Sequence, residues 1–376
     1  MSSAVEGRRR SLALADKMGA TVDAVLCTSP ENIYFFTGFR TMLYTRFTAA
    51  LIRIDQPEEP ILIAASVDRL LIEDRVWSPP WTSRVVLHGP DATANIVASP
   101  AAALALHLGG VRRLGVDSIR LSELDEVKSA APNVEIVQAL GSIDAIKEIK
   151  GEQEIEYLRQ SNRLAMQGIE TARAMLAEKP ITEVEIAVRL DADARLGGAD
   201  GFGYPTLVSW GAKIAAPHSP ALHRRVEPHQ PLRIAFGPTV EGYSADVVRT
   251  LCLGEPPKEL VRLQDAFFAA QEAVVRLINP GVAVPELMEA VRTVYGRWDL
   301  LGLWGKNIGH GLGLTIHETP RIGGVSKAIL GEGMVVAIEP FVIVPGFGGY
   351  AHCDVFVVTK TGTELLTPGL RHIIQV

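Results

Sequence analysis

Three short segments in the second half of this 376-residue chain constrain its structure more than its composition does. Residues 242–250 read GYSADVVRT, residues 308–321 read IGHGLGLTIHETPR, and residues 333–340 read GMVVAIEP. The glycines beside His310 allow neighbouring backbone to pack closely around its imidazole. Glu339 follows an apolar run, where a carboxylate is costly unless it is paired or functional. The segments therefore indicate a functional site.

In this order along the chain, the three segments resemble the pita-bread fold that methionine aminopeptidase, prolidase and creatinase (family M24) share. The resemblance covers nearly the whole chain, including a small first domain. It implies an α+β protein, with a smaller α/β N-terminal domain at residues 1–145. A pita-bread (creatinase/aminopeptidase-like) catalytic domain is expected at residues 146–376.

Local patterns also favour two domains, because a chain of this length exceeds one ordinary hydrophobic core. Before residue 145, short apolar runs alternate with helical patterns, as in an α/β layer. From Lys147 to Glu178, apolar residues recur at helical spacing and predict one long helix. Thr182 and Glu185 then match a capping box at the start of the next helix.

The peptidases of the resembling family hold two metal ions with two Asp, one His and two Glu. Three of these ligands correspond to Asp246, His310 and Glu339. The other two positions are Ala235 and Cys353. Alanine cannot bind a metal, and one thiol cannot bridge two hard cations as a carboxylate does. The sequence therefore predicts that the two-metal arrangement is absent and that no metal or other cofactor takes part.

The resemblance to creatinase, a metal-free member of the family, adds further candidates. Its catalytic histidine lies in the loop that holds His218, and an imidazole can accept and return a proton near neutral pH. Tyr44 and Arg46 match a pair that reaches the partner subunit's site in creatinase and binds the substrate carboxylate. Arginine suits that role because its planar fork pairs with a carboxylate. Arg321 matches another creatinase arginine.

These matches favour metal-independent hydrolysis of a C–N bond in a small amidine or amide that bears a carboxylate. Val248 stands where creatinase has a glutamate facing the guanidinium, which argues against creatine itself. A homodimer with shared active sites is expected. The predicted catalytic residues are His218, Glu339, Asp246, His310 and His317. The predicted substrate-binding residues are Tyr44, Arg46, Arg321 and Cys353.

Two alternatives stay open. The first is an Xaa-Pro metallopeptidase with a reduced site, in which Cys353 joins the three remaining ligands around one zinc ion. The second is a non-catalytic pita-bread binding protein. Asp246 has a structural interpretation as well, as a hydrogen-bond acceptor for Arg249.

Bulk properties narrow the partners and the compartment. The net charge of -6 argues against nucleic acid as a partner. The Ala-rich stretch at residues 99–110 is too short to span a bilayer, so no membrane partner is expected. The three cysteines are sparse, and the apolar run behind Arg8–Arg10 is too short for a signal peptide. A cytoplasmic location is therefore expected.

Overall fold

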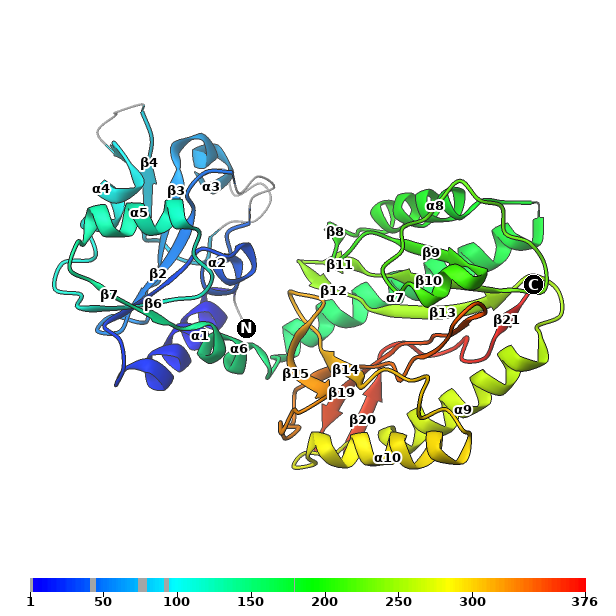
Figure 1. Ribbon diagram of the computed structural model, residues 1–376. Coiled ribbons are helices and arrows are strands. Elements are labelled where there is room, and N and C mark those ends of the chain that lie inside the picture. The colour runs from blue at the N-terminus through cyan, green and yellow to red at the C-terminus, as the bar shows by residue number, and fades with distance from the viewer. Residues whose placement is uncertain (1–2, 41–44, 74–79, 91–94, 179) are drawn as a thin grey trace. The chain divides into compact units, whose positions relative to one another are not determined.

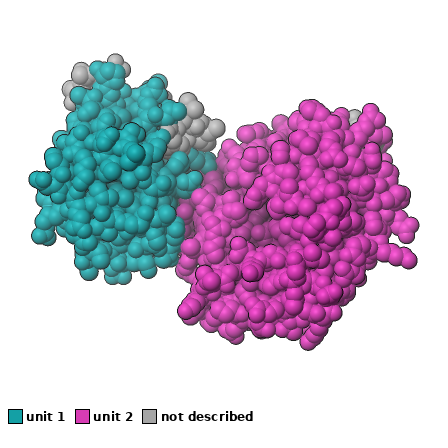
Figure 2. All heavy atoms as spheres, viewed as in Figure 1, with its two compact units in different colours: residues 1–146 teal, residues 147–376 magenta. Residues whose placement is uncertain are grey.

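The computed structural model describes residues 3–40, 45–73, 80–90, 95–178 and 180–376. The chain divides into two compact units, residues 1–146 and residues 147–376 (Figure 2).

Unit 1 is built on one mixed sheet of seven strands in the order β5-β4-β3-β2-β1-β6-β7 (Figure 1). Its strands are β1 (Ala24–Cys27), β2 (Ala49–Arg53), β3 (Ile61–Ala65), β4 (Val85–His88), β5 (Ile96–Val97), β6 (Arg113–Val116) and β7 (Glu135–Gln138). Its helical elements are α1 (Ser3–Met18), α2 (Pro30–Thr37), η1 (Ser66–Asp68), α3 (Arg69–Glu73), α4 (Pro100–Ala105), α5 (Leu121–Ala130) and α6 (Leu140–Lys147). The central strands β1 and β3 are buried along their whole length, as expected for a sheet covered on both faces.

Unit 2 contains two larger sheets, in the orders β21-β13-β10-β9 and β15-β14-β16-β19-β20, and two smaller ones. Its strands are β8 (Gly201–Phe202), β9 (Leu207–Trp210), β10 (Pro231–Phe236), β11 (Pro238–Val240), β12 (Tyr243–Ser244), β13 (Val247–Cys252), β14 (Asn307–Gly311), β15 (Glu318–Gly323), β16 (Val335–Ile338), β17 (Val342–Val344), β18 (Gly348–Tyr350), β19 (Asp354–Thr359), β20 (Gly362–Leu365) and β21 (Ile374–Gln375). Its helical elements are α7 (Glu152–Glu178), α8 (Glu183–Leu196), η2 (Gly211–Ala215), α9 (Lys258–Val275) and α10 (Val284–Arg297).

The helices of unit 2 cover its sheets in pairs. Helices α7 and α8 share a hydrophobic core with β10 and β13. Helices α9 and α10 share a second core with β14, β16 and β19. In Figure 1, α8 and α10 lie on opposite sides of the strands. The two pairs of helices thus cover opposite sides of the strands.

A small apolar cluster lies where the two larger sheets meet. Val248 of β13 forms a bridge with Cys353, whose backbone N–H donates to the Val248 carbonyl oxygen at 3.1 Å. The side chains of this junction cluster are Ala235, Val248, Ala337, Ala351 and Cys353.

The predicted capping box is confirmed, because Thr182 Oγ1 accepts from the Glu185 N–H at the start of α8. The prediction of one helix from Lys147 is wrong: α6 ends at Lys147 and α7 begins at Glu152. The intervening backbone bonds elsewhere, since the Lys150 N–H donates to Gly333 O at 3.0 Å. Tertiary pairing therefore overrides the helical periodicity at this point.

None of the helices in the described ranges is long and apolar enough to cross a membrane.

Candidate active site

A cavity of about 390 Å³ lies in unit 2 beside the junction cluster. All five predicted catalytic residues line it: His218, Asp246, His310, His317 and Glu339. They come from four parts of the chain: His218 lies in a loop, Asp246 precedes β13, Glu339 follows β16, and the segment 308–321 supplies both His310 and His317.

Three of these residues bring their donor atoms together. Asp246 directly precedes β13, His310 lies within β14, and Glu339 follows β16. His310 Nε2 lies 3.4 Å from Asp246 Oδ2 and 3.5 Å from Glu339 Oε1. The three donor atoms all lie within 4.8 Å of one another. Among the described residues, Cys353 does not belong to this group of possible ligands. This spacing suits ligands around a single ion.

The orientation of His310 indicates that the group is built for a positive charge. Its Nδ1 lies 3.0 Å from the carbonyl oxygen of Gly311, which can only accept, so Nδ1 carries the hydrogen. Nε2 therefore faces two carboxylates, and this arrangement is favourable only when a proton or a metal ion lies there. Gly311 itself is required, because a Cβ would lie 2.1 Å from the Thr319 carbonyl oxygen.

The pKa shifts agree with this electrostatic picture. Burial acts to lower the pKa of His310, but hydrogen bonds and charges from Asp246 and Glu339 outweigh it and raise the pKa to about 10. Burial, together with the charge of Asp246, raises the pKa of Glu339. A cation at Nε2 thus relieves the repulsion between two buried carboxylates.

The neighbours of this group include Tyr204 and His317. Tyr204 Oη donates to Asp246 Oδ1 at 3.2 Å and fixes that carboxylate. The His317 ring is perpendicular to the His310 ring, with centroids 4.4 Å apart. Burial, followed by the charges of His310 and Arg321, lowers the pKa of His317 to about 4. His317 is therefore a neutral hydrogen-bonding group at neutral pH.

Two of the predicted substrate-binding residues in unit 2 lie away from the cavity wall. Arg321 is exposed on β15, opposite His310 in register, and does not line the cavity. Cys353 is buried in the junction cluster, where burial raises the pKa of its thiol well above the usual value. Its sulfur does not belong to the group of donor atoms formed by Asp246, His310 and Glu339, which argues against the fourth zinc ligand considered from the sequence.

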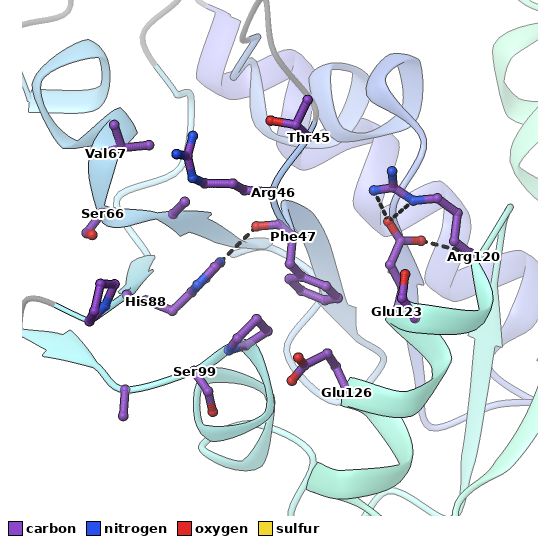
Figure 3. Close-up of a pocket in the computed structure, with 16 residues that line it drawn as sticks. Thr45, Arg46, Phe47, Ser66, Val67, His88, Ser99, Arg120, Glu123 and Glu126 are labelled. Carbon is purple, nitrogen blue, oxygen red and sulfur yellow. Dashed lines mark hydrogen bonds and ion pairs between the residues drawn. The ribbon is translucent and has the colours of Figure 1, made fainter.

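The remaining two predicted residues belong to unit 1. Tyr44 lies outside the described residues. Arg46 lines a hollow of about 720 Å³ together with Ser66, His88 and Ser99 (Figure 3). His88 Nε2 donates to the Phe47 carbonyl oxygen at 2.8 Å in this hollow. The predicted homodimer, in which Tyr44 and Arg46 complete the partner's site, stays a prediction.

Sequence patterns did not single out Tyr204 or Arg233, which both line the cavity. A signal for Arg233 was available, because residues two apart on a strand share a face and Ala235 already marked a ligand position.

Arg249 does not line the cavity and belongs instead to a buried network of hydrogen bonds. Arg249 Nη2 donates to Asp354 Oδ1 at 2.8 Å, and both side chains are almost fully buried. Asp246 is therefore not the partner of Arg249. His352 Nε2 lies 3.0 Å from Asp354 Oδ2, and its ring packs against Phe267 and Phe268.

We expect the free energy of unfolding to decrease between about pH 6.5 and pH 4 because of His352. Burial lowers the pKa of His352 to about 4, below the value of about 6.5 for an unfolded chain. In this window the unfolded state binds more protons than the folded state, so acidification favours unfolding. The full effect is on the order of 3 kcal/mol. Urea denaturation at several pH values, in chelator, measures it.

The matched variants are His352→Phe, whose ring fits the aromatic surroundings, and His223→Gln at an exposed histidine. The pH slope should flatten only in His352→Phe. An unchanged slope in that variant would assign the acid sensitivity to other groups.

Comparison with known proteins identifies the family. The model for metallopeptidase family M24 matches residues 156–360, and the model for the creatinase/prolidase N-terminal domain matches residues 10–149. The chain belongs to the M24 metallopeptidase family. An Xaa-Pro dipeptidase of Pyrococcus horikoshii is 28% identical over 268 residues, covering 71% of this chain and 76% of that protein.

Solved structures confirm the predicted α+β pita-bread fold. An X-Pro aminopeptidase from Thermotoga maritima has a TM-score of 0.80 and 25% identity, covering 94% of this chain and 98% of that one. An Xaa-Pro dipeptidase from Bacillus anthracis has a TM-score of 0.85 and 24% identity, with 100% of both chains covered. At that identity the second likeness shows the fold alone.

The metal-independent, creatinase-like function predicted from the sequence is contradicted by these comparisons, since the similar proteins are Xaa-Pro peptidases of a metallopeptidase family. The broader expectation of a hydrolase holds, whereas an amidinohydrolase is not supported. The metal-independent prediction was wrong because Ala235 and Cys353 replace only two of the five ligands of the resembling peptidases. Asp246, His310 and Glu339 still converge.

Proposed function

We propose that this chain is a metal-dependent hydrolase that cleaves Xaa-Pro dipeptides, with one divalent ion held by Asp246, His310 and Glu339. The observation that carries the proposal is the orientation of His310, whose Nε2 faces both carboxylates while Nδ1 donates to Gly311. The substrate class follows from the names of the similar proteins.

The donor set fits one ion and not two. Catalytic zinc sites have three protein ligands and keep a further position open for water or substrate. The two carboxylates of Asp246 and Glu339 and the imidazole of His310 match this number of ligands. The second position lacks donors, because Ala235 has none and Cys353 lies in the apolar junction cluster, outside the converging donor group.

A divalent ion held by Asp246, His310 and Glu339 would polarise the substrate carbonyl and activate a water molecule. In the proposed reaction, His317 would donate a hydrogen bond to the substrate. His218 would take the proton that the attacking water loses and pass it to the leaving nitrogen. The apolar side chains of Leu207, Ile316 and Phe341 line the cavity and suit a proline ring.

The test is hydrolysis of a set of Xaa-Pro dipeptides after dialysis against chelator and after return of Mn²⁺, Co²⁺ or Zn²⁺. We expect turnover only with metal, and none with matched Xaa-Ala dipeptides or with creatine. A metal-loaded protein that cleaves no Xaa-Pro dipeptide contradicts the proposal. Turnover that survives complete metal removal contradicts the metal dependence.

We expect one tightly held ion per chain, and two after the double substitution Ala235→Asp with Cys353→Glu. The substitutions restore carboxylates at the two positions where the resembling peptidases have them. Elemental analysis after gel filtration gives the stoichiometry, with Ala235→Asp alone as the matched control, since one added carboxylate does not complete the second site. Two ions in the unaltered protein would show that other residues supply the missing donors.

A further inference from the structure

Arg233 is a buried cation in the cavity wall. It lies on β10 and lines the cavity on the same strand face as Ala235, two positions along the strand. Its exposed fraction is 3%, yet no carboxylate of the described residues lies within 4.0 Å of its guanidinium. A buried charge without a direct ion-pair partner is costly, so one is expected only where it serves a purpose.

The hydrogen bonds of Arg233 leave part of its guanidinium available. Nη1 donates to Ile214 O at 3.4 Å, and Nη2 donates to Ser209 Oγ at 3.3 Å and to the Pro217 carbonyl oxygen. Nε has no acceptor among the described residues. A guanidinium has five N–H donors, so Nε–H and one Nη1–H stay uncommitted. All of its hydrogen-bond acceptors are neutral, and the charge of Glu339 acts on the guanidinium only from beyond ion-pair distance.

We propose that Arg233 is an anion-binding residue of this cavity and that it holds a carboxylate of the ligand. The guanidinium supplies a fixed positive charge to the cavity wall that also contains Ala235. Burial lowers the pKa of Arg233 to about 10, so the side chain stays charged at neutral pH. In an Xaa-Pro dipeptide this anion is the terminal carboxylate, a detail that rests on the proposed function. The site then selects free dipeptides over amidated or longer ones.

The test compares the binding of small carboxylates with that of their amides by calorimetry: proline against prolinamide, and acetate against acetamide. Binding is measured with metal-loaded and with chelator-treated protein, because a carboxylate on the metal would not depend on Arg233. We expect each carboxylate to bind roughly tenfold to hundredfold more tightly than its amide. Arg233→Met should abolish this preference and Arg233→Lys should retain part of it, in both preparations.

The fold of each variant is checked by circular dichroism and by its thermal midpoint, because Arg233 also contacts the loop that carries His218. If Arg233 only positions that loop, Arg233→Met lowers kcat while the carboxylate preference is kept, which overturns the proposal. Equal affinity for carboxylate and amide in the unaltered protein, or no binding of either, overturns it as well. Carboxylate binding through Arg233 without Xaa-Pro hydrolysis would remove the proposed activity and leave this site standing.

Discussion

Replacing His310 with alanine is expected to abolish both metal retention and dipeptide hydrolysis. The substitution removes the one nitrogen ligand and leaves Asp246 and Glu339 facing each other, so that they share a proton instead of binding an ion. We expect kcat/KM to fall by at least about three orders of magnitude, because both the polarising ion and the oriented site are lost. Elemental analysis and an Xaa-Pro assay on the same sample measure the two losses together.

The control is His223→Ala, which removes an exposed histidine that does not line the cavity. It should retain metal and activity. If His310→Ala keeps a full equivalent of metal and loses only turnover, the ion lies elsewhere and His310 acts in another way.

Replacing Asp354 with asparagine is expected to destabilise the protein by roughly 3–5 kcal/mol, because the change leaves the charge of Arg249 buried without its carboxylate. Arg249 is fully buried and also donates to the carbonyl oxygens of Cys353 and Thr367. It cannot turn toward water without breaking these bonds. Urea denaturation at neutral pH gives the loss.

Glu364→Gln is the matched control, because Glu364 pairs with Arg159 in a partly exposed position. That loss should stay below about 1 kcal/mol. The double variant Arg249→Met with Asp354→Leu removes both charges and should recover much of the lost stability. Equal losses in Asp354→Asn and Glu364→Gln would show that burial does not set the strength of the pair.

The resemblance to the M24 family was sufficient to predict the fold, and it marked Asp246, His310 and Glu339 as the remaining ligand positions. The structure brings these three side chains together from a strand and two strand ends. The capping box at Thr182 could also be predicted from the sequence, since it depends on two residues that are three positions apart.

Other features depend on packing that no local pattern reports. The missing ligands at Ala235 and Cys353 suggested that no metal was needed, but the decisive group is the backbone carbonyl of Gly311, which orients His310. The burial of Arg233 depends on its contacts with the carbonyl oxygens of Ile214 and Pro217. No sequence motif links Arg233 to these two residues. The break between α6 and α7 depends likewise on pairing with a distant segment around Gly333.

The apolar junction cluster has a consequence for how the protein matures. In a site made of many carboxylates, repulsion between them disfavours the folded state until metal ions bind. Here two of the ligand positions are occupied by Ala235 and Cys353, which pack in the apolar junction cluster and add no negative charge. Under the proposed function, we therefore expect the polypeptide to fold without its ion and to bind the ion afterwards. A shortage of metal would then lower the activity of the protein but not the amount of folded protein.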